Sequence, residues 1–343
     1  MLIPPGHLAP VVAGERLERL SQAVSATREE FRCAFSRFGE TDPRVAWDHT
    51  PIELWPFLRC EDGSLLLLSP RALQGRMTRG IYFRMMEAAR GAEHEGGTED
   101  SRVERFTRFC GLLAERYVLN LVKRSHEVHE PDPPVGIYGE KRYRVGKSRS
   151  MSPDLAIVQP PDLVLVEVFS GRAPLQARVD PTPKDLHTTL EKMLIDKLEQ
   201  LQDRIAELLE GHLTFQGMGD VATLKIWPVL LLAGEGIALT PIVWSWVEMC
   251  IPEGSFSDQR VGPPTICNLD EFERLLVLVE RGHLLPALLA SFHDSSYSRL
   301  PFTNWISDTY DIEADEIATY VDEQFAAISR RYREWVRSGG SDA

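Results

Sequence analysis

The sequence lacks the cysteine patterns that hold small domains or zinc ions together. Its five cysteines are odd in number and widely spaced, and no two of them form a CxxC pair. Neither a disulfide framework nor a zinc ribbon is therefore expected. Reduced thiols in a cytosol are the simplest interpretation, so we expect a cytoplasmic protein.

Long uninterrupted apolar runs are also missing. The N-terminus has neither a basic start nor a long hydrophobic segment, so no secretory signal is expected. The most apolar stretch, residues 226–250, is interrupted by prolines, glycines and Glu235. A buried strand pair explains this stretch better than a membrane span, and no membrane partner is expected.

Positive charge is scarce over the whole chain. The 38 Lys and Arg residues are outnumbered by 51 Asp and Glu residues, which gives a net charge of −13 and argues against a protein that coats nucleic acid non-specifically. The charge is uneven, since residues 101–150 hold 11 basic and 6 acidic residues (net +5). Residues 213–343 hold 9 and 19 (net −10). This acidic region could contact a basic protein partner or only give solubility.

Several common catalytic motifs are not found. There is no GxSxG sequence and no cysteine–histidine motif that can be read locally. Gly146-Lys147-Ser148 resembles the end of a P-loop, but Lys141 stands where its first glycine belongs. HEVHEPDPP, residues 126–134, is not the HExxH helix of zinc proteases, and we expect it to be a surface loop.

The order of expected elements divides the chain into three regions. Residues 1–100 form an N-terminal α+β module in this interpretation, and residues 101–235 form a core. Residues 236–343 form an acidic, mainly helical C-terminal region. The core alternates helices and strands, which predicts the α/β class with a mixed central sheet flanked by helices.

Hydrophobic spacing predicts individual elements within these regions. Apolar residues recur at helical spacing over residues 14–38, 101–123 and 185–213. Short apolar runs predict strands on either side of a turn at residues 61–63, and over residues 224–232 and 242–247.

Two carboxylates interrupt a pair of apolar strands in SPDLAIVQPPDLVLVEVFSGR, residues 152–172. Asp154 opens the first strand and Glu167 lies near the end of the second, inside LVLVEVF. A carboxylate buried there is costly unless a metal ion or a cation satisfies it. Asp154 could simply start a strand, but Mg²⁺ and Mn²⁺ prefer such oxygen ligands, so the pair predicts a metal site.

These residues resemble the PD-(D/E)xK nuclease superfamily. Pro153-Asp154 matches its PD, and Glu167-Val168-Phe169 stands where its ExK belongs, with the two acids 13 positions apart. The resemblance implies a restriction-endonuclease-like core in which Asp154 and Glu167 bind Mg²⁺ or Mn²⁺. It also implies a glutamate from the preceding helix, for which Glu115 in GLLAERYV is the candidate.

Phe169 departs from the motif, because it replaces the lysine that orients water or offsets charge on the phosphate. Some members of the superfamily carry this lysine on the following helix. Lys197 is then the candidate, with Gln200 on the same helical face as a supporting residue. Lys192 is a second choice. Arg172 is a weaker substitute, since a guanidinium binds phosphate but is too basic to exchange a proton.

A basic segment directly precedes the two acids. KRYRVGKSR, residues 141–149, holds five cations in nine residues: Lys141, Arg142, Arg144, Lys147 and Arg149. A basic strip with nearby tyrosines can follow a phosphate backbone, and Arg172 could add to it. A solvated hairpin without a ligand is the alternative.

Two functions fit these observations. The first is a metal-dependent nuclease, with Glu115, Asp154, Glu167 and Lys197 as catalytic residues; the resemblance implies DNA as the substrate and a bacterial restriction, repair or defence setting. The second is a catalytically degenerate nuclease fold that serves as a nucleic-acid- or protein-binding scaffold, which Phe169 and the net charge of −13 favour.

Overall fold

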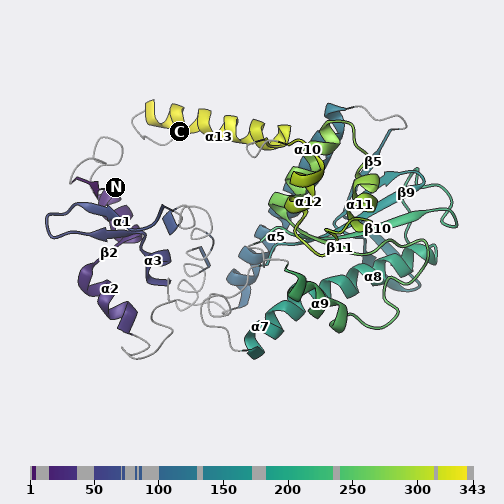
Figure 1. Ribbon diagram of the computed structural model, residues 1–343, viewed down its shortest axis with the longest axis horizontal. Coiled ribbons are helices and arrows are strands. Elements are labelled where there is room, and N and C mark those ends of the chain that lie inside the picture. The colour runs from purple at the N-terminus through teal and green to yellow at the C-terminus, as the bar shows by residue number, and fades with distance from the viewer. Residues whose placement is uncertain are drawn as a thin grey trace. The chain divides into compact units, whose positions relative to one another are not determined.

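Two compact units make up the chain in the computed structural model (Figure 1). The first comprises Met1–Phe106, Arg178–Asp180 and Ser329–Ala343, and the second comprises Thr107–Ala177 and Pro181–Ile328. The second unit thus takes in most of the expected core and most of the expected C-terminal region. The structure describes residues 2–4, 15–36, 50–70, 72–73, 82, 85–86, 100–129, 134–171, 183–234, 240–312 and 316–337.

The first unit is built around a four-stranded mixed sheet with the strand order β1-β4-β3-β2. Its strands are β1 (Leu2–Ile3), β2 (Ser25–Thr27), β3 (Phe57–Arg59) and β4 (Leu65–Leu67), and its helices are α1 (Glu15–Val24), α2 (Arg28–Phe35) and α3 (Thr50–Leu54). The expected turn at residues 61–63 is confirmed, since it joins the antiparallel strands β3 and β4.

A single helix over residues 14–38 was the wrong expectation. The short strand β2 separates α1 from α2, because Thr27 begins a new helix there. The Thr27 hydroxyl accepts from the Glu30 N–H, and the Glu30 carboxylate accepts from the Thr27 N–H. This reciprocal cap fixes the start of α2 and interrupts the apparent helical periodicity.

The second unit contains a five-stranded mixed sheet with the order β11-β10-β9-β8-β5. The strands β9, β10 and β11 are parallel, whereas β8 runs antiparallel to β9 and β5 antiparallel to β8. The strands are β5 (Gly136–Gly139), β8 (Leu155–Gln159), β9 (Asp162–Phe169), β10 (Lys225–Leu232) and β11 (Thr265–Asn268). The α/β class and the mixed sheet are therefore as expected.

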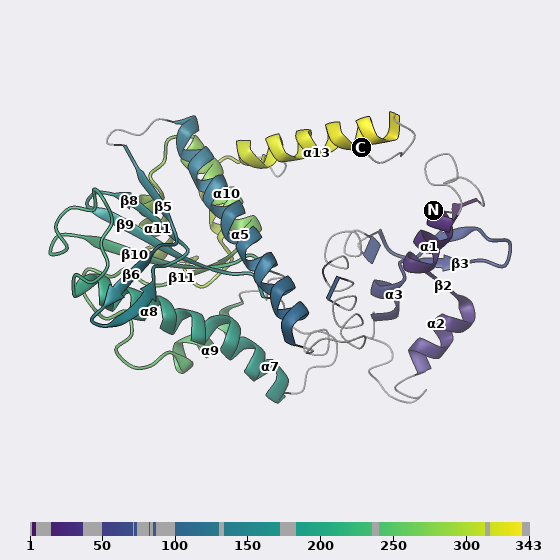
Figure 2. The ribbon, with the colours of Figure 1, turned by 180° about the vertical axis from the view of Figure 1, so that it is seen from behind.

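Helices cover both faces of this sheet (Figures 1 and 2). One face packs on α5 (Asp100–Val128), α10 (Leu269–Glu280), α11 (Leu285–His293) and α12 (Phe302–Thr309). The other face packs on α8 (Asp196–Leu209) and α9 (Pro241–Cys250). Strands β8 and β9 are buried on both faces, which explains their nearly continuous apolar sequence.

The helix expected over residues 185–213 is a helical run of three parts. These parts are α7 (Pro183–Leu190), a π-helical turn η4 (Glu191–Ile195) and α8. The run ends at Leu209, and Gly211 follows with a φ of +80°, a conformation that only glycine adopts at little cost. A π-helical turn inside a helix often accompanies a functional site, and this one directly precedes Lys197.

Two local expectations were wrong. Residues 242–247 lie in helix α9 and not in a strand, because Thr240 caps the helix and Pro241 occupies its first turn. The expected loop over residues 126–134 begins later, since α5 continues to Val128. His126 is buried in that helix, with Nδ1 2.8 Å from the Val122 carbonyl oxygen.

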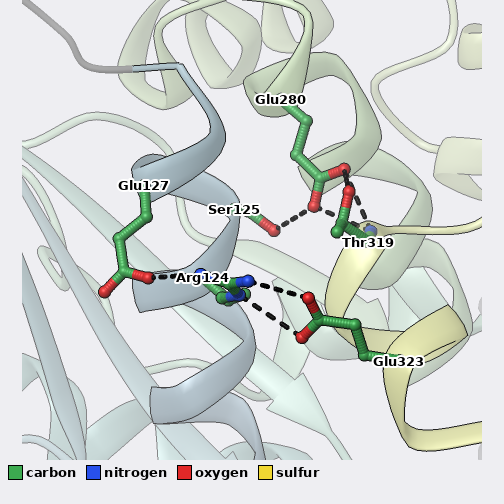
Figure 3. Close-up of polar contacts among 6 residues, drawn as sticks. All are labelled: Arg124, Ser125, Glu127, Glu280, Thr319 and Glu323. Atoms are coloured by element: carbon green, nitrogen blue, oxygen red, sulfur yellow. Dashed lines mark hydrogen bonds and ion pairs between the residues drawn. The ribbon is translucent and has the colours of Figure 1, made fainter.

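Helix α13 (Thr319–Arg337) begins at the second unit, where carboxylates fix its first turns (Figure 3). The partly buried Glu280 carboxylate accepts from the Thr319 N–H at 3.0 Å, from the Thr319 hydroxyl at 2.7 Å and from the Ser125 hydroxyl at 2.9 Å. The Arg124 guanidinium donates to both carboxylate oxygens of Glu323, at 2.7 and 3.3 Å. These contacts join α5, α10 and α13.

No helix in the part of the chain that the structure describes is long and apolar enough to cross a membrane. The apolar stretch at residues 226–250 is divided between strand β10 and helix α9, with residues 235–239 outside the described ranges.

Candidate active site

Asp154 and Glu167 lie opposite each other on two neighbouring strands. In the antiparallel pairing of β8 with β9, Leu155 faces Val166, so the next position in the register places Asp154 opposite Glu167. Directly opposite residues share one face of a sheet. The prediction that both acids lie on the same face is therefore confirmed. The Asp154 carboxylate also accepts from the Val168 N–H at 2.7 Å, which fixes its orientation beside β9.

Lys197 on α8 contacts this acid pair. Its Nζ lies 2.9 Å from Glu167 Oε1 and 2.9 Å from Gln200 Oε1. The contact forms because Leu194, Leu198 and Leu201 bury the same side of the helical run against the sheet. The expected placement of the Lys197 amine beside the acids is confirmed, whereas its part in a reaction stays a prediction.

Phe169 does not point a polar group at the acids. Its ring is partly buried and packs against the apolar cluster that includes Leu190 and Leu194. The ring also restricts the residue two positions later, because a Cβ on Gly171 would lie 2.3 Å from a Phe169 ring carbon. The strand position where the resemblance implies a lysine therefore has a packing role, and the cation that contacts Glu167 is Lys197 on α8.

Burial dominates the electrostatics of the acid pair. The Glu167 side chain is 3% exposed, and its Oε2 has no hydrogen-bond partner in the described part of the chain. Burial raises the pKa of Glu167, although the Lys197 ammonium opposes this shift. Burial and the neighbouring Glu167 carboxylate raise the pKa of Asp154 to about 8. The Lys197 ammonium thus compensates Glu167, whereas the Asp154 carboxyl, with its raised pKa, is largely protonated at neutral pH, and a cation would have to displace that proton.

Glu115 belongs to the same electrostatic group. It lies half-buried on α5, and burial raises its pKa, with further contributions from Glu140 and Glu167. Its Oε1 and the Ser170 hydroxyl oxygen lie 3.7 and 3.5 Å from the point where a Cβ on Gly111 would stand. The structure thus brings Glu115 to the end of β9, although no hydrogen bond joins it to Asp154 or Glu167.

Glu140 is an acidic neighbour that the sequence interpretation missed. Gly139 on β5 faces Leu155 on β8, so the register continues with Glu140 opposite Asp154. Glu140, Asp154 and Glu167 therefore stand in one row across three strands. The negative charge of Glu140 raises the pKa of both Glu115 and Glu167. The sequence carried no direct signal for this row, because the pairing of β5 with β8 joins distant residues.

Arg204 is a second residue that was missed. It lies one helical turn beyond Gln200 on α8, and its positive charge lowers the pKa of Glu167. Its spacing from Lys197 is i to i+7, which places both cations on one helical face and could have identified it. Arg204 Nη1 donates to Ser150 Oγ at 2.9 Å and to Glu207 Oε2 at 3.0 Å.

The acid pair fits a magnesium-type ion better than a closed protein cage. Among the described residues, no group of three or more His, Cys, Asp or Glu side chains is placed to hold a metal ion. Mg²⁺ is usually held by one or two carboxylates, with water and substrate phosphate filling the remaining positions. The unpartnered Glu167 Oε2 suits such an ion, which would displace the proton of Asp154.

The basic segment forms a separate hairpin of β6 (Arg142–Val145) and β7 (Ser148–Met151). Its cations Arg142, Arg144, Lys147 and Arg149 are exposed. Lys141 differs from them, because its Nζ donates to the Thr214 carbonyl and lies 4.2 Å from the centre of the Phe215 ring. Burial lowers the pKa of Lys141, so this lysine serves the fold more than a ligand.

Two further residues were predicted as candidate cations, and the structure describes one of them. Lys192, the second choice for the relocated lysine, is exposed on η4. Arg172 lies outside the described residues, which stop at Gly171 before resuming at Pro183. Of the two candidate cations that the structure describes, Lys192 and Lys197, the one placed at the site is Lys197.

Comparisons with known proteins do not supply a function for this chain, so a function has to be inferred from the chemistry of the site. No protein-family model matches this chain. No curated protein matches it either.

Proposed function

We propose that this chain is a metal-dependent nuclease of the PD-(D/E)xK type that hydrolyses phosphodiester bonds, with DNA as its substrate. The observation that carries the proposal is the contact of Lys197 with Glu167, which itself faces Asp154. The motif lacks its usual lysine at Phe169, and a helix supplies one in its place. A bacterial restriction, repair or defence setting belongs to the same proposal.

The order of elements supports a restriction-endonuclease-like core. Helix α5 carries Glu115, the antiparallel strands β8 and β9 carry Asp154 and Glu167, and α8 carries Lys197. Strand β10 then returns parallel to β9. This is the order that the resemblance implies: four elements position one residue each, and a fifth, β10, extends the sheet.

In the proposed reaction, Asp154 and Glu167 hold the ion, which when bound would polarise the phosphate and lower the pKa of an attacking water. Lys197 keeps Glu167 ionised through its 2.9 Å contact and offsets negative charge that builds on the phosphate. Gln200 accepts a hydrogen bond from the same amine and so fixes its position. Glu115 adds negative charge that favours cation binding.

Titration calorimetry with Mg²⁺ and Mn²⁺ tests the metal site. Wild type should bind the ion, and Glu167→Gln should lose the binding isotherm, because the amide keeps the shape and removes the charge. Glu199→Gln, on the exposed side of α8, is the matched control and should bind as wild type does. An unchanged isotherm for Glu167→Gln would mean that Lys197 alone satisfies this glutamate.

A catalytically degenerate scaffold is the second candidate. Two observations favour it: Phe169 packs in the core, and Lys197 already pairs with Glu167. A scaffold would bind nucleic acid or protein without cleavage. Magnesium-dependent cleavage of DNA by wild type, lost in Asp154→Asn, would decide for the nuclease.

A further inference from the structure

The hairpin β6–β7 gathers three guanidinium groups on one face. In its register, Arg144 lies opposite Arg149 and Arg142 lies opposite Met151. Side chains alternate along a strand, so Arg142, Arg144 and Arg149 share one face. All three are exposed, and none forms an ion pair with another residue that the structure describes.

This arrangement is unfavourable for the protein alone. Like charges directly opposite each other destabilise an antiparallel pair. The chain has 51 acidic residues against 38 basic ones, yet no described carboxylate neutralises this face. An external anion would remove the repulsion, whereas a hairpin that only needed solubility would not require two arginines opposite each other.

The opposite face of the hairpin is fixed to α8. The Tyr143 hydroxyl donates to the Glu207 carboxylate, and Arg204 donates to Ser150 Oγ at 2.9 Å. At its base, the Lys141 N–H donates to Ser152 Oγ at 2.9 Å. Two strands of four residues are marginally stable by themselves, so these contacts hold the guanidinium face in place. Helix α8 thus carries both Lys197 and the anchor of the hairpin.

We propose that Arg142, Arg144 and Arg149 form a surface that binds the phosphodiester backbone of a nucleic acid, independent of base sequence. One guanidinium group can bind two phosphate oxygens at once. Contacts to the nucleic-acid backbone carry no information about base sequence. Strand β7 leads through Ser152 and Pro153 into Asp154, so Arg149 lies five residues from the acid pair, at most about 17 Å along an extended strand. That the bound strand is then cleaved rests on the proposed function, whereas its binding does not.

Fluorescence anisotropy with a labelled DNA duplex tests this surface, in EDTA so that no divalent ion supports cleavage. Arg144→Ser/Arg149→Ser should bind roughly tenfold or more weakly than wild type at 0.1 M salt, because two phosphate contacts are lost. The slope of log K against log salt should become shallower by about 2. Arg330→Ser/Arg331→Ser on α13, which gives the same net charge, should bind as wild type does.

Three further measurements test whether the variant is folded, whether charge alone restores binding, and whether DNA and RNA bind in the same way. The serine pair should melt at the wild-type temperature or above it, because a repulsion is removed. Arg144→Lys/Arg149→Lys should recover most of the binding. A single-stranded RNA probe should also bind more weakly to Arg144→Ser/Arg149→Ser than to wild type, since both probes offer phosphodiester groups.

Two results would overturn the proposal: wild type that binds neither probe at 50 mM salt, or serine and control pairs that bind equally well. Failure of the nuclease proposal is a different outcome, namely binding that depends on the hairpin without cleavage in Mg²⁺.

Discussion

At the scale of single residues, Glu167 determines what the site must contain. It is buried inside an apolar strand, one of its oxygens contacts Lys197, and the other has no partner among the described residues. Leaving a buried acceptor unsatisfied costs roughly 1–3 kcal/mol, and more when it is charged. A bound cation would recover this cost, which supports the proposed metal site.

Lys197→Met tests the proposed role of Lys197 in place of the motif lysine. Cleavage should fall by about two or more orders of magnitude, because charge on the phosphate is no longer offset. Metal binding in calorimetry should remain, since Asp154 and Glu167 are unchanged. Lys192→Met, on the exposed η4 turn of the same helical run, is the matched control and should cleave normally. Equal cleavage by wild type and Lys197→Met would exclude Lys197 from the reaction.

Glu140→Gln tests the row of three acids. The charge of Glu140 raises the pKa of Glu115 and Glu167, so its removal should lower the repulsion within the group. We expect slightly higher thermal stability without metal and an affinity for Mn²⁺ weakened by roughly two- to fivefold, the size typical of an exposed charge. A metal affinity equal to that of Glu199→Gln would show that Glu140 does not act on the ion.

The sequence predicted the residues of the site better than their surroundings. Asp154 and Glu167 could be placed together because they occur on consecutive strands joined by a tight turn, and Lys197 followed from the resemblance, which implies a lysine on the next helix. Glu140 could not be found this way, since it depends on the pairing of β5 with β8. The internal use of Lys141 depends in turn on Thr214 and Phe215, which are distant in sequence.

At the scale of elements, the ends of β9 and β10 approach each other more closely than side chains permit. A Cβ on Gly234 would lie 2.0 Å from the Gly171 carbonyl oxygen and 3.1 Å from that of Ser170. The Ala233 N–H donates to the Phe169 carbonyl at 2.9 Å, which holds the two strand ends together. The missing side chain at Gly234 therefore permits this close approach of the two strand ends.

Alanine at two glycines should have opposite effects. Gly234→Ala should destabilise the protein by roughly 1–3 kcal/mol, since backbone atoms must move to admit the methyl group. Gly111→Ala should stabilise it by about 0.5–1 kcal/mol, because the position is inside helix α5 and the new Cβ meets only ordinary contacts of 3.5 and 3.7 Å. Urea unfolding measures both, and equal stability of the two variants would contradict this account.

The sequence analysis predicted a strand where the structure has helix α9, because the apolar residues there are nearly continuous. PIVWSWV, residues 241–247, has no polar residue except Ser245, so its periodicity cannot distinguish the two. The capping Thr240 and the following Pro241 decide for a helix. Strands β8 and β9 were predicted correctly because their runs are short and β-branched, with turn residues Pro160 and Pro161 between them.

At the scale of the whole molecule, the buried His293 should make the stability of the fold depend on pH below neutrality. His293 lies against Thr265 Oγ1 at 2.8 Å, and burial lowers its pKa to about 4 in the folded protein, although Asp294 opposes the shift. The folded state therefore binds fewer protons than the unfolded state, and stability falls as pH drops from about 6.5 towards 4. The full shift corresponds to about 3 kcal/mol.

His293→Gln isolates this contribution, because glutamine can still bond to Thr265 and does not titrate. Urea unfolding of wild type and of this variant should be compared at pH 7 and pH 4.5. The variant should lose less stability between the two pH values. The buried acids, whose pKa values are raised, have the opposite pH dependence in both proteins and cancel in this comparison. Equal losses would place the His293 pKa near its ordinary value.

The attachment of α13 has a consequence for synthesis on the ribosome. Arg124 and Glu323 are 199 residues apart in sequence, and Val321 enters the same apolar cluster as Val118 and Leu121. Contacts of such long range slow folding, because a large loop must close before they form. A nascent chain that stops short of Thr319 leaves the Glu280 carboxylate without the donors of that residue. The second unit therefore cannot complete its core until the segment up to Val321 has emerged.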